Sequence, residues 1–226
     1  MRQVMHRFRT GETFLVDAPT PTPGPRHVVV AVSRSLISAG TERMLVEFGQ
    51  SGWLQKARQQ PEKVRMVLSK LRTDGLRSTV DAVRAKLEQP IPLGYSCTGR
   101  VVAVGREVSS IQVGERVACN GPHGERVAVP ENLCALVPDE VEDDAAAFAV
   151  VGAIGLQGIR LAAPTLGEVF AVSGLGLIGL LAVQMLRANG VRVLGLDLDP
   201  DRLELARNMG ADVARVGSEE DPEQVA

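Results

Sequence analysis

The sequence has no long apolar run, no strong net charge and no paired set of cysteines. Glycines and charged residues interrupt every candidate membrane span, so we expect no membrane insertion. No apolar core of a secretory signal follows the first methionine. The three cysteines, at 97, 119 and 134, favour free thiols in a reducing cytoplasm over a disulfide framework. The net charge of −2 indicates no general attraction to nucleic acid.

The 226 residues have the composition of a globular protein, with 45% hydrophobic and 23% charged residues. This length suits one or two domains. Residues 168–199 organise the chain, because they contain an apolar strand, a glycine-rich turn, a helix and a second apolar strand in that order. The helix pattern ends at Asn189-Gly190, as expected for a C-terminal glycine.

The glycine-rich turn has the G-x-G-x-x-G spacing. Its six residues are Gly174, Leu175, Gly176, Leu177, Ile178 and Gly179. The first glycine permits a tight turn, the second lets a pyrophosphate approach the backbone, and the third lets the helix pack on the sheet. The N-terminus of the following helix offers free N–H groups to a phosphate. The pattern predicts a dinucleotide-binding site.

An acid at the end of the second strand indicates which dinucleotide is bound. Asp197 lies 18 residues after Gly179, where a carboxylate accepts hydrogen bonds from a ribose 2′-hydroxyl. Its charge would repel a 2′-phosphate, which favours NAD. Arg202 favours NADP instead, since a guanidinium at this position binds a 2′-phosphate. NADP therefore remains an alternative.

The residues before this turn predict a strand-rich domain with one helical insertion. Short strands at near-regular spacing are typical of a small β-barrel-like domain. The expected strands are 2–9, 13–18, 27–37, 100–104, 113–117, 124–129 and 133–137, and the expected helices are 139–150 and 153–163. Residues 53–89 have helical spacing and contain nine Lys or Arg and four acids. They form either a solvated helical pair or a basic arm that attracts a phosphorylated substrate or another subunit.

These patterns place a β-rich domain at 1–150 and the first half of a dinucleotide-binding domain at 151–226. An open sheet of that kind normally has two halves of three strands each. We therefore expect that the natural protein continues or that a partner supplies the missing strands.

Several blocks in register resemble the medium-chain dehydrogenase/reductase superfamily, the zinc-type alcohol dehydrogenase group with a GroES-like domain. The blocks are Pro92-Leu93-Gly94-Tyr95, Gly99 to Gly105, Val113 to Val117, Val129 to Leu133, Val137-Pro138-Asp139, Ala145 to Phe148 and Gly174 to Gly179. The block Ile37 to Arg43 and the basic insertion are similar to the N-terminal half of bi-domain oxidoreductases that continue into a Gfo/Idh/MocA-type module. The resemblance implies an α/β chain with a GroES-like domain and a Rossmann-type parallel sheet.

The chain departs from the zinc pattern that this resemblance implies. Ala39 stands where the zinc enzymes have Cys, Tyr95 where they have His, and Ser96 where Glu is frequent. A catalytic zinc needs three protein ligands of N, S or O type, so we expect no zinc. Cys119 and His123 are four residues apart, but no further ligand lies nearby in sequence.

Without zinc, hydrogen bonds must polarise a substrate carbonyl. The resemblance places Thr41 at the superfamily's proton-relay hydroxyl and Tyr95 at the vacated metal position. Either hydroxyl is a candidate catalytic donor; alternatively, Tyr95 fills space and Thr41 caps a helix. His6 and His27 are expected at the surface.

Two functions are therefore open. The first is an NAD(P)-dependent oxidoreductase that transfers hydride to or from a small carbonyl or alcohol substrate, sugar-derived in the narrower resemblance. The second is a non-catalytic dinucleotide-binding or interaction module, or an inactive fragment of a larger dehydrogenase. The possible partners are a second copy of the chain or the missing C-terminal module.

Overall fold

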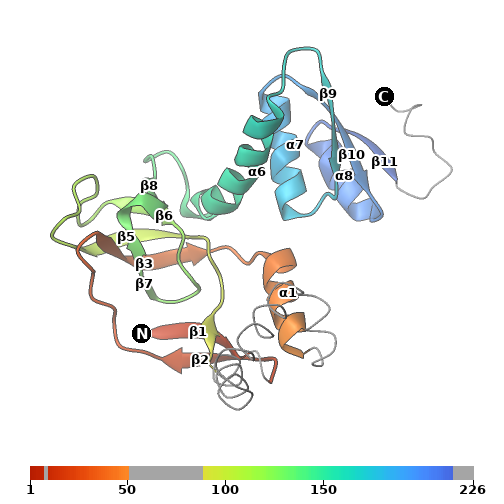
Figure 1. The fold of residues 1–226 in the computed structure, drawn as a ribbon. Coiled ribbons are helices and arrows are strands. Elements are labelled where there is room, and N and C mark those ends of the chain that lie inside the picture. The colour runs from red at the N-terminus through yellow and green to blue at the C-terminus, as the bar shows by residue number, and fades with distance from the viewer. Residues whose placement is uncertain (8–9, 51–88, 216–226) are drawn as a thin grey trace, which may run out of the picture. The chain divides into compact units, whose positions relative to one another are not determined.

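The computed structural model describes residues 1–7, 10–50 and 89–215, which divide into two compact units (Figure 1). The first unit ends at Asp143 and the second begins at Asp144. The domain limits 1–150 and 151–226 derived above stay a prediction. The basic insertion at 53–89, apart from its last residue, and the chain after residue 215 lie outside the described residues.

The first unit is built from two antiparallel sheets. The larger has the strand order β7-β3-β5-β6-β8 and the smaller the order β2-β1-β4. The strands are β1 (Arg2–Arg7), β2 (Glu12–Asp17), β3 (His27–Ser35), β4 (Ile91–Pro92), β5 (Cys97–Val104), β6 (Arg116–Cys119), β7 (Arg126–Pro130) and β8 (Cys134–Leu136). The prediction of a β-rich domain with short strands is confirmed.

The core of the first unit lies on one face of the larger sheet. β3 contains the apolar run Val28–Val32, in which Val28 and Val30 are fully buried. Val30 lies opposite Val101 of β5, and Val117 and Val127 come from the neighbouring strands. Each fully buried Val side chain contributes on the order of 2 kcal/mol. Before Ala149 the described helices are α1 (Ala39–Gln50), the short 3-10 helix η1 (Glu131–Leu133) and α5 (Asp143–Ala146), which begins at the last residue of the first unit.

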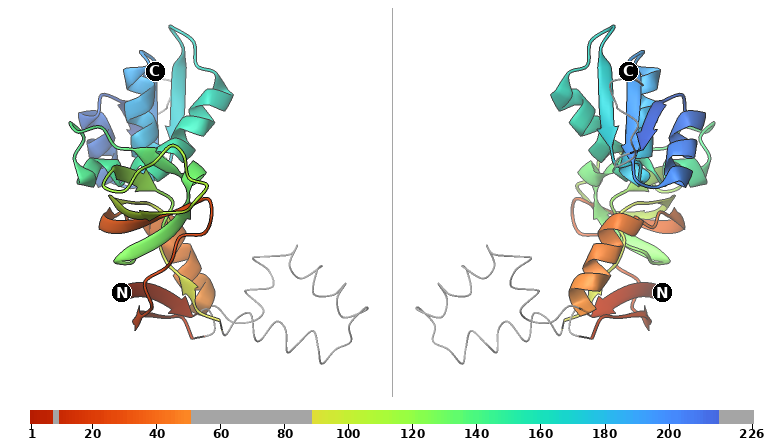
Figure 2. Two further views of the ribbon diagram at one scale, coloured as in Figure 1. Left: turned by 90° about the vertical axis from the view of Figure 1, so that its left-hand side faces the viewer. Right: turned by 90° about the vertical axis from the view of Figure 1, so that its right-hand side faces the viewer.

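The second unit alternates helices with parallel strands. Its elements are α6 (Ala149–Ala162), β9 (Val169–Ser173), α7 (Leu177–Ala188), β10 (Arg192–Asp197), α8 (Pro200–Asn208) and β11 (Asp212–Arg215). The three strands pair in the order β11-β10-β9, side by side in Figure 2. Val183 and Leu186 of α7 bury against Val193 of β10, with Leu203 of α8 in the same cluster. The predicted strand, turn, helix and strand are confirmed.

The helical stretch before this sheet differs from the expectation. The sequence predicts helices at 139–150 and 153–163, whereas α5 is a single turn and α6 runs without a break from Ala149 to Ala162. The expected break at 151–152 was wrong, because the amide of Gly152 donates to the carbonyl of Phe148 and continues the helix. The end at Ala163 is confirmed: it adopts a left-handed conformation with φ of 48°.

The expectation that His6 lies at the surface was wrong. Its side chain on β1 is fully buried, and its Nδ1 lies 3.0 Å from the hydroxyl of Thr13 on β2. Burial lowers the pKa of His6. A strand of alternating exposure places residues on both faces, and the sequence alone did not show which face of β1 is covered.

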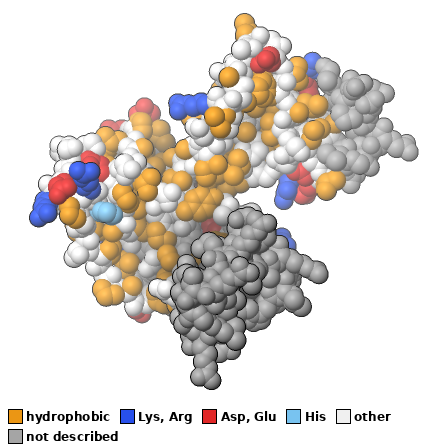
Figure 3. All heavy atoms as spheres, in the orientation of Figure 1, with side chains coloured by type: hydrophobic (Ala, Val, Ile, Leu, Met, Phe, Trp, Pro, Cys, Tyr) orange, Lys and Arg blue, Asp and Glu red, His pale blue; other side chains and the backbone are white. Residues whose placement is uncertain are grey.

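Charged groups are dispersed over the described surface. Acidic and basic side chains lie next to one another on the face shown in Figure 3. Glu107 lies 3.2 Å from Arg26 and 3.6 Å from Arg106. Among the described residues, no helix has the length and apolar character needed to cross a membrane.

Candidate functional site

The glycine-rich turn of the second unit has the geometry that its sequence predicts. β9 ends at Ser173, and Gly174 turns the chain with φ of +87°, a conformation that side chains rarely adopt. The amide of Gly174 donates to the carbonyl of Leu196 on β10 over 2.8 Å, which ties the turn to the sheet. Leu175 is fully buried in the unit's core, whereas Ile178 is 40% exposed and Leu177 half-buried.

The other two glycines of the turn have different surroundings. A Cβ at Gly179 would lie 2.0 Å from the carbonyl oxygen of Gly174, so only glycine lets α7 approach the turn. A Cβ at Gly176 would meet nothing within 4 Å. Gly176 is the N-cap of α7 and makes no side-chain cap. The backbone at the start of α7 is therefore open to a ligand, as a pyrophosphate requires.

Asp197 lies beside this turn. Its Oδ2 accepts the amide N–H of Leu175 over 2.6 Å, and its Oδ1 accepts the amide of Asp199 over 2.9 Å. These two N–H groups and the guanidinium of Arg202 lower the pKa of Asp197, although its burial acts in the opposite direction. A carboxylate has about four acceptor positions, so Asp197 keeps capacity for a ribose diol.

Arg202 lies over the same carboxylates. Its Nη1 is 3.7 Å from Oδ2 of Asp197, and its Nε is 3.5 Å from Oδ2 of Asp199. About half of the Arg202 side chain is exposed. The structure thus places all the predicted cofactor residues of this unit around one turn, with the guanidinium directed at acids.

In the first unit, the structure brings Tyr95 against Ser38. The Tyr95 hydroxyl donates to Ser38 Oγ over 2.8 Å, and Tyr95 is half-buried. Ser38 directly precedes α1, and its amide donates to Oε1 of Glu42 over 2.9 Å. Thr41 is the third residue of α1 and half-buried, so it lies inside the helix and Ser38 occupies the place before it.

The sequence analysis missed a pair of buried side chains next to these hydroxyls. His123 Nε2 lies 3.0 Å from Oε2 of Glu42, and His123 Nδ1 lies 2.9 Å from Ser35 Oγ. The side chains of His123 and Glu42 are only 10% and 9% exposed. We call Ser35, Ser38, Glu42, Tyr95 and His123 the polar network.

The lack of a side chain at Gly94 leaves room for the His123 ring in the polar network. Gly94 has φ of +87°, and a Cβ on it would lie 2.7 Å from three atoms of the His123 ring. The amide of His123 also donates to the carbonyl of Leu93 over 2.7 Å. The Leu93-Gly94-Tyr95 segment and His123 therefore fit together, with Tyr95 directly after the contact. The only sequence signal was a glycine before Tyr95, and it does not point to residue 123.

The positions of the superfamily's zinc ligands do not converge on a metal-binding set. Ala39 has no donor atom, the Tyr95 hydroxyl is bonded to Ser38, and Ser96 is buried. His123 is bonded to Glu42 and not to Cys119, whose sulfur lies 3.4 Å from that of Cys97. In the part of the chain that the structure describes, no group of three or more His, Cys, Asp or Glu has a metal-binding arrangement.

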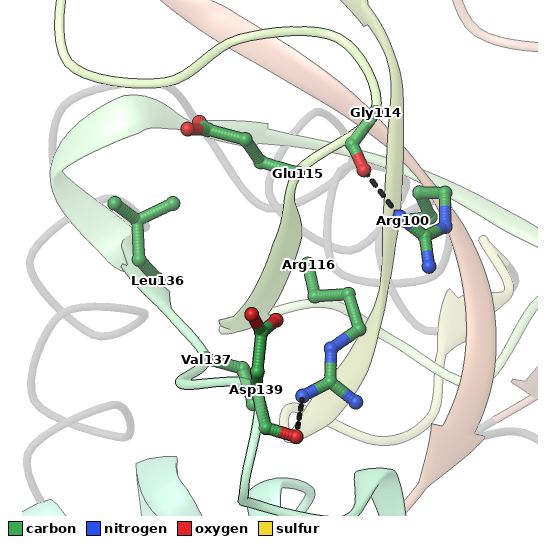
Figure 4. Close-up of a pocket in the computed structure, with 7 residues that line it drawn as sticks. All are labelled: Arg100, Gly114, Glu115, Arg116, Leu136, Val137 and Asp139. Carbon is green, nitrogen blue, oxygen red and sulfur yellow. Dashed lines mark hydrogen bonds between the residues drawn. The ribbon is translucent and has the colours of Figure 1, made fainter.

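A pocket of about 280 Å³ lies elsewhere in the first unit, and structural arginines line it (Figure 4). Arg100 donates to the carbonyl of Gly114. Arg116 donates to the carbonyls of Pro138 and Val141 and pairs with Asp143 over 3.2 Å. Because these guanidiniums are occupied by the protein's own oxygens, the pocket is not our candidate site.

Comparison with known proteins agrees with this architecture. Residues 64–159 match the model of the alcohol dehydrogenase GroES-like domain. The (R,R)-butanediol dehydrogenase of Bacillus subtilis is 30% identical over 150 residues, which are 54% of this chain and 43% of that protein. The chain spans about half the length of the curated relatives it matches.

Solved structures share the fold. A short chain alcohol dehydrogenase of Escherichia coli complexed with NADH has a TM-score of 0.74 at 21% identity, over 99% of this chain and 65% of that one. The quinone oxidoreductase of Thermus thermophilus, solved also with NADPH, has a TM-score of 0.66 at 24% identity, over 95% of this chain and 59% of that one. The chain therefore shares its fold with these dehydrogenases and reductases, and residues 64–159 are similar to the GroES-like domain of alcohol dehydrogenases.

Proposed function

We propose that this chain binds NAD and is part of an oxidoreductase that transfers hydride to or from a carbonyl or alcohol substrate without zinc. The observation that carries the proposal is the 2.6 Å hydrogen bond between Asp197 and the amide of Leu175 inside the glycine turn. This bond holds the Asp197 carboxylate beside the glycine turn, which supports a role for Asp197 at the ribose and for the turn at the pyrophosphate. The relatives named above are dehydrogenases and reductases, which supports the reaction class.

The residues of the second unit fit a dinucleotide. The open space at Gly176 and the uncapped start of α7 suit a pyrophosphate, and Asp197 suits a ribose diol. The lowered pKa of Asp197 keeps its carboxylate ionised at neutral pH. A 2′-phosphate would therefore meet a negative charge, and Arg202 is engaged by the same carboxylates, so NAD is favoured over NADP.

The first unit would supply the proton chemistry. When bound, the nicotinamide accepts or delivers the hydride. The Tyr95 hydroxyl would donate a hydrogen bond to the substrate oxygen, and the Ser38 hydroxyl would then donate to the Tyr95 oxygen in place of its present acceptor role. The Glu42–His123 pair holds the start of α1, and with it Ser38, in this position. Thr41 is the second candidate hydroxyl.

The donor chemistry at the former metal positions supports a zinc-free site. A zinc there would have to displace the Tyr95–Ser38 hydrogen bond and would find no donor at Ala39. Elemental analysis of the purified protein tests this directly. Stoichiometric zinc would contradict the proposal, and its absence after expression in zinc-supplemented medium would support it.

The same missing donors favour a second candidate, a dinucleotide-binding module without its own turnover. NADH binding together with oxidation of NADH by a panel of carbonyl compounds supports the enzyme. Binding without turnover supports the module.

The narrower resemblance to bi-domain oxidoreductases, a sugar-derived substrate and a cytoplasmic location also stay predictions.

Replacing Asp197 tests the cofactor site. Asp197→Ser should weaken NADH binding about tenfold or more and improve NADPH relative to NADH, measured by titration calorimetry. Asp212→Asn is the matched control, because Asp212 is an exposed acid of the same unit that pairs with Arg192. An unchanged NADH/NADPH ratio in the Asp197 variant would remove this residue from the site.

A further inference from the structure

The three cysteines, far apart in sequence, lie in one row across the larger sheet. Cys97 of β5 is the direct partner of Cys119 of β6, and Cys119 is in turn the direct partner of Cys134 of β8. Directly opposed residues of antiparallel strands present their side chains on the same face. The sulfurs of Cys97 and Cys119 are 3.4 Å apart. All three are free thiols.

The row leads from the interior outward. Cys97 and Cys119 are fully buried, whereas Cys134 is half-buried. The hydrogen bond from the Cys119 thiol lowers the pKa of Cys134, while the pKa of Cys119 is raised because its two neighbours hold its proton in place. The least buried of the three thiols is therefore also one whose thiolate is favoured, and the thiolate is the reactive form.

We propose that Cys134, Cys119 and Cys97 form an oxidation site for a small hydroperoxide, with Cys134 as the entry thiol and Cys119 as its resolving partner. The Cys134 thiolate attacks the peroxide, its sulfur is oxidised to a sulfenic acid, and the O–O bond breaks with release of water or alcohol. The Cys119 sulfur then attacks the Cys134 sulfur, the S–O bond breaks, and a second water leaves. Two thiols and one peroxide yield one disulfide.

Cys97 allows this disulfide to move inward. Its thiolate attacks the Cys119 sulfur, a Cys97–Cys119 bond forms, and the Cys134 thiolate leaves and is protonated. The backbone geometry suits both disulfides, since opposed residues in an antiparallel pair have Cα atoms about 4.5–5.5 Å apart and disulfides need about 4.4–6.8 Å. The Cys97 and Cys119 sulfurs have only to close from 3.4 Å.

None of the three cysteines belongs to the polar network or the glycine turn, although Cys97 is the strand partner of Ser35. The test is peroxide treatment of the reduced, purified protein, followed by free-thiol counting and peptide mass spectrometry. The wild-type protein should lose two thiols and contain an intramolecular disulfide that includes Cys119. Three thiols that remain reduced, or disulfides only between chains, would overturn the proposal.

Three single variants test the order of events. Cys134→Ser should slow disulfide formation about tenfold or more, since it removes the least buried of the three thiols. Cys119→Ser should leave a Cys134 sulfenic acid that a dimedone-type reagent traps. Cys97→Ser should still form the Cys119–Cys134 disulfide at the wild-type rate. If Cys134→Ser reacts as fast as the wild-type protein, Cys134 is not the entry thiol and the proposal fails.

Discussion

The glycine turn and the polar network are built in opposite ways. The turn is made of backbone within one contiguous stretch, from Gly174 to Asp197, and its shape depends on where side chains are absent. The polar network is made of side chains from segments up to 88 residues apart, such as Ser35 and His123. A local pattern was therefore enough to predict the glycine turn, whereas the polar network depends on contacts between distant segments.

The largest effect is expected from breaking the buried pair in the polar network. His123→Leu leaves the Glu42 carboxylate buried without its partner and should destabilise the protein by about 3–5 kcal/mol in urea unfolding. The double variant Glu42→Leu/His123→Leu removes both polar groups and should be less destabilised than His123→Leu alone. If the double variant loses as much stability as Glu42→Leu and His123→Leu together, the two side chains are not coupled, and the pair contributes no more than a surface contact would.

The second largest effect is expected on kcat when the Tyr95 hydroxyl of the polar network is removed. Tyr95→Phe keeps the ring but removes the donor, and should lower kcat for carbonyl reduction with NADH by about 100-fold. Its stability should fall by only about 1 kcal/mol, the value of one hydrogen bond. Thr41→Val, measured in the same assay, decides between the two candidate hydroxyls. A wild-type rate for Tyr95→Phe would exclude Tyr95 as the donor.

In the glycine turn, two matched substitutions should separate folding from binding. Gly179→Ala pushes a Cβ toward the carbonyl of Gly174 and should cost about 1–3 kcal/mol in thermal unfolding. Gly176→Ala meets open space and should change stability by less than about 0.5 kcal/mol while it weakens NADH binding. Equal stability losses in both variants would contradict the close approach that distinguishes the two positions.

The smallest effect concerns His6, whose burial lowers its pKa. The unfolded chain then takes up a proton at higher pH than the folded protein does, so this contribution to stability is present above about pH 6.5 and decreases as the pH falls below it. Unfolding free energies measured at about pH 7.5 and about pH 5.5 should therefore differ less in His6→Gln than in the wild-type protein. An identical pH dependence would show that His6 is accessible to solvent in the folded state.

Features that depend on local patterns could be predicted from the sequence, whereas features that depend on contacts between distant segments could not. The strands and helices of the second unit follow from apolar runs bounded by glycines, and those signals are local. The expected break between the helices 139–150 and 153–163 was wrong, because the amide of Gly152 donates to the carbonyl of Phe148 and the helix continues. His6 was placed at the surface because one strand's alternation does not reveal which face a neighbouring layer covers.

The amino-acid sequence by itself determined the β-rich and α/β parts and the glycine turn. Each of these depends on residue type at a short spacing. Only the tertiary structure decided that His123 meets Glu42, that Tyr95 bonds to Ser38, and that the thiols form one row. These contacts depend on strand register and chain crossing, which bring together residues that no local pattern connects.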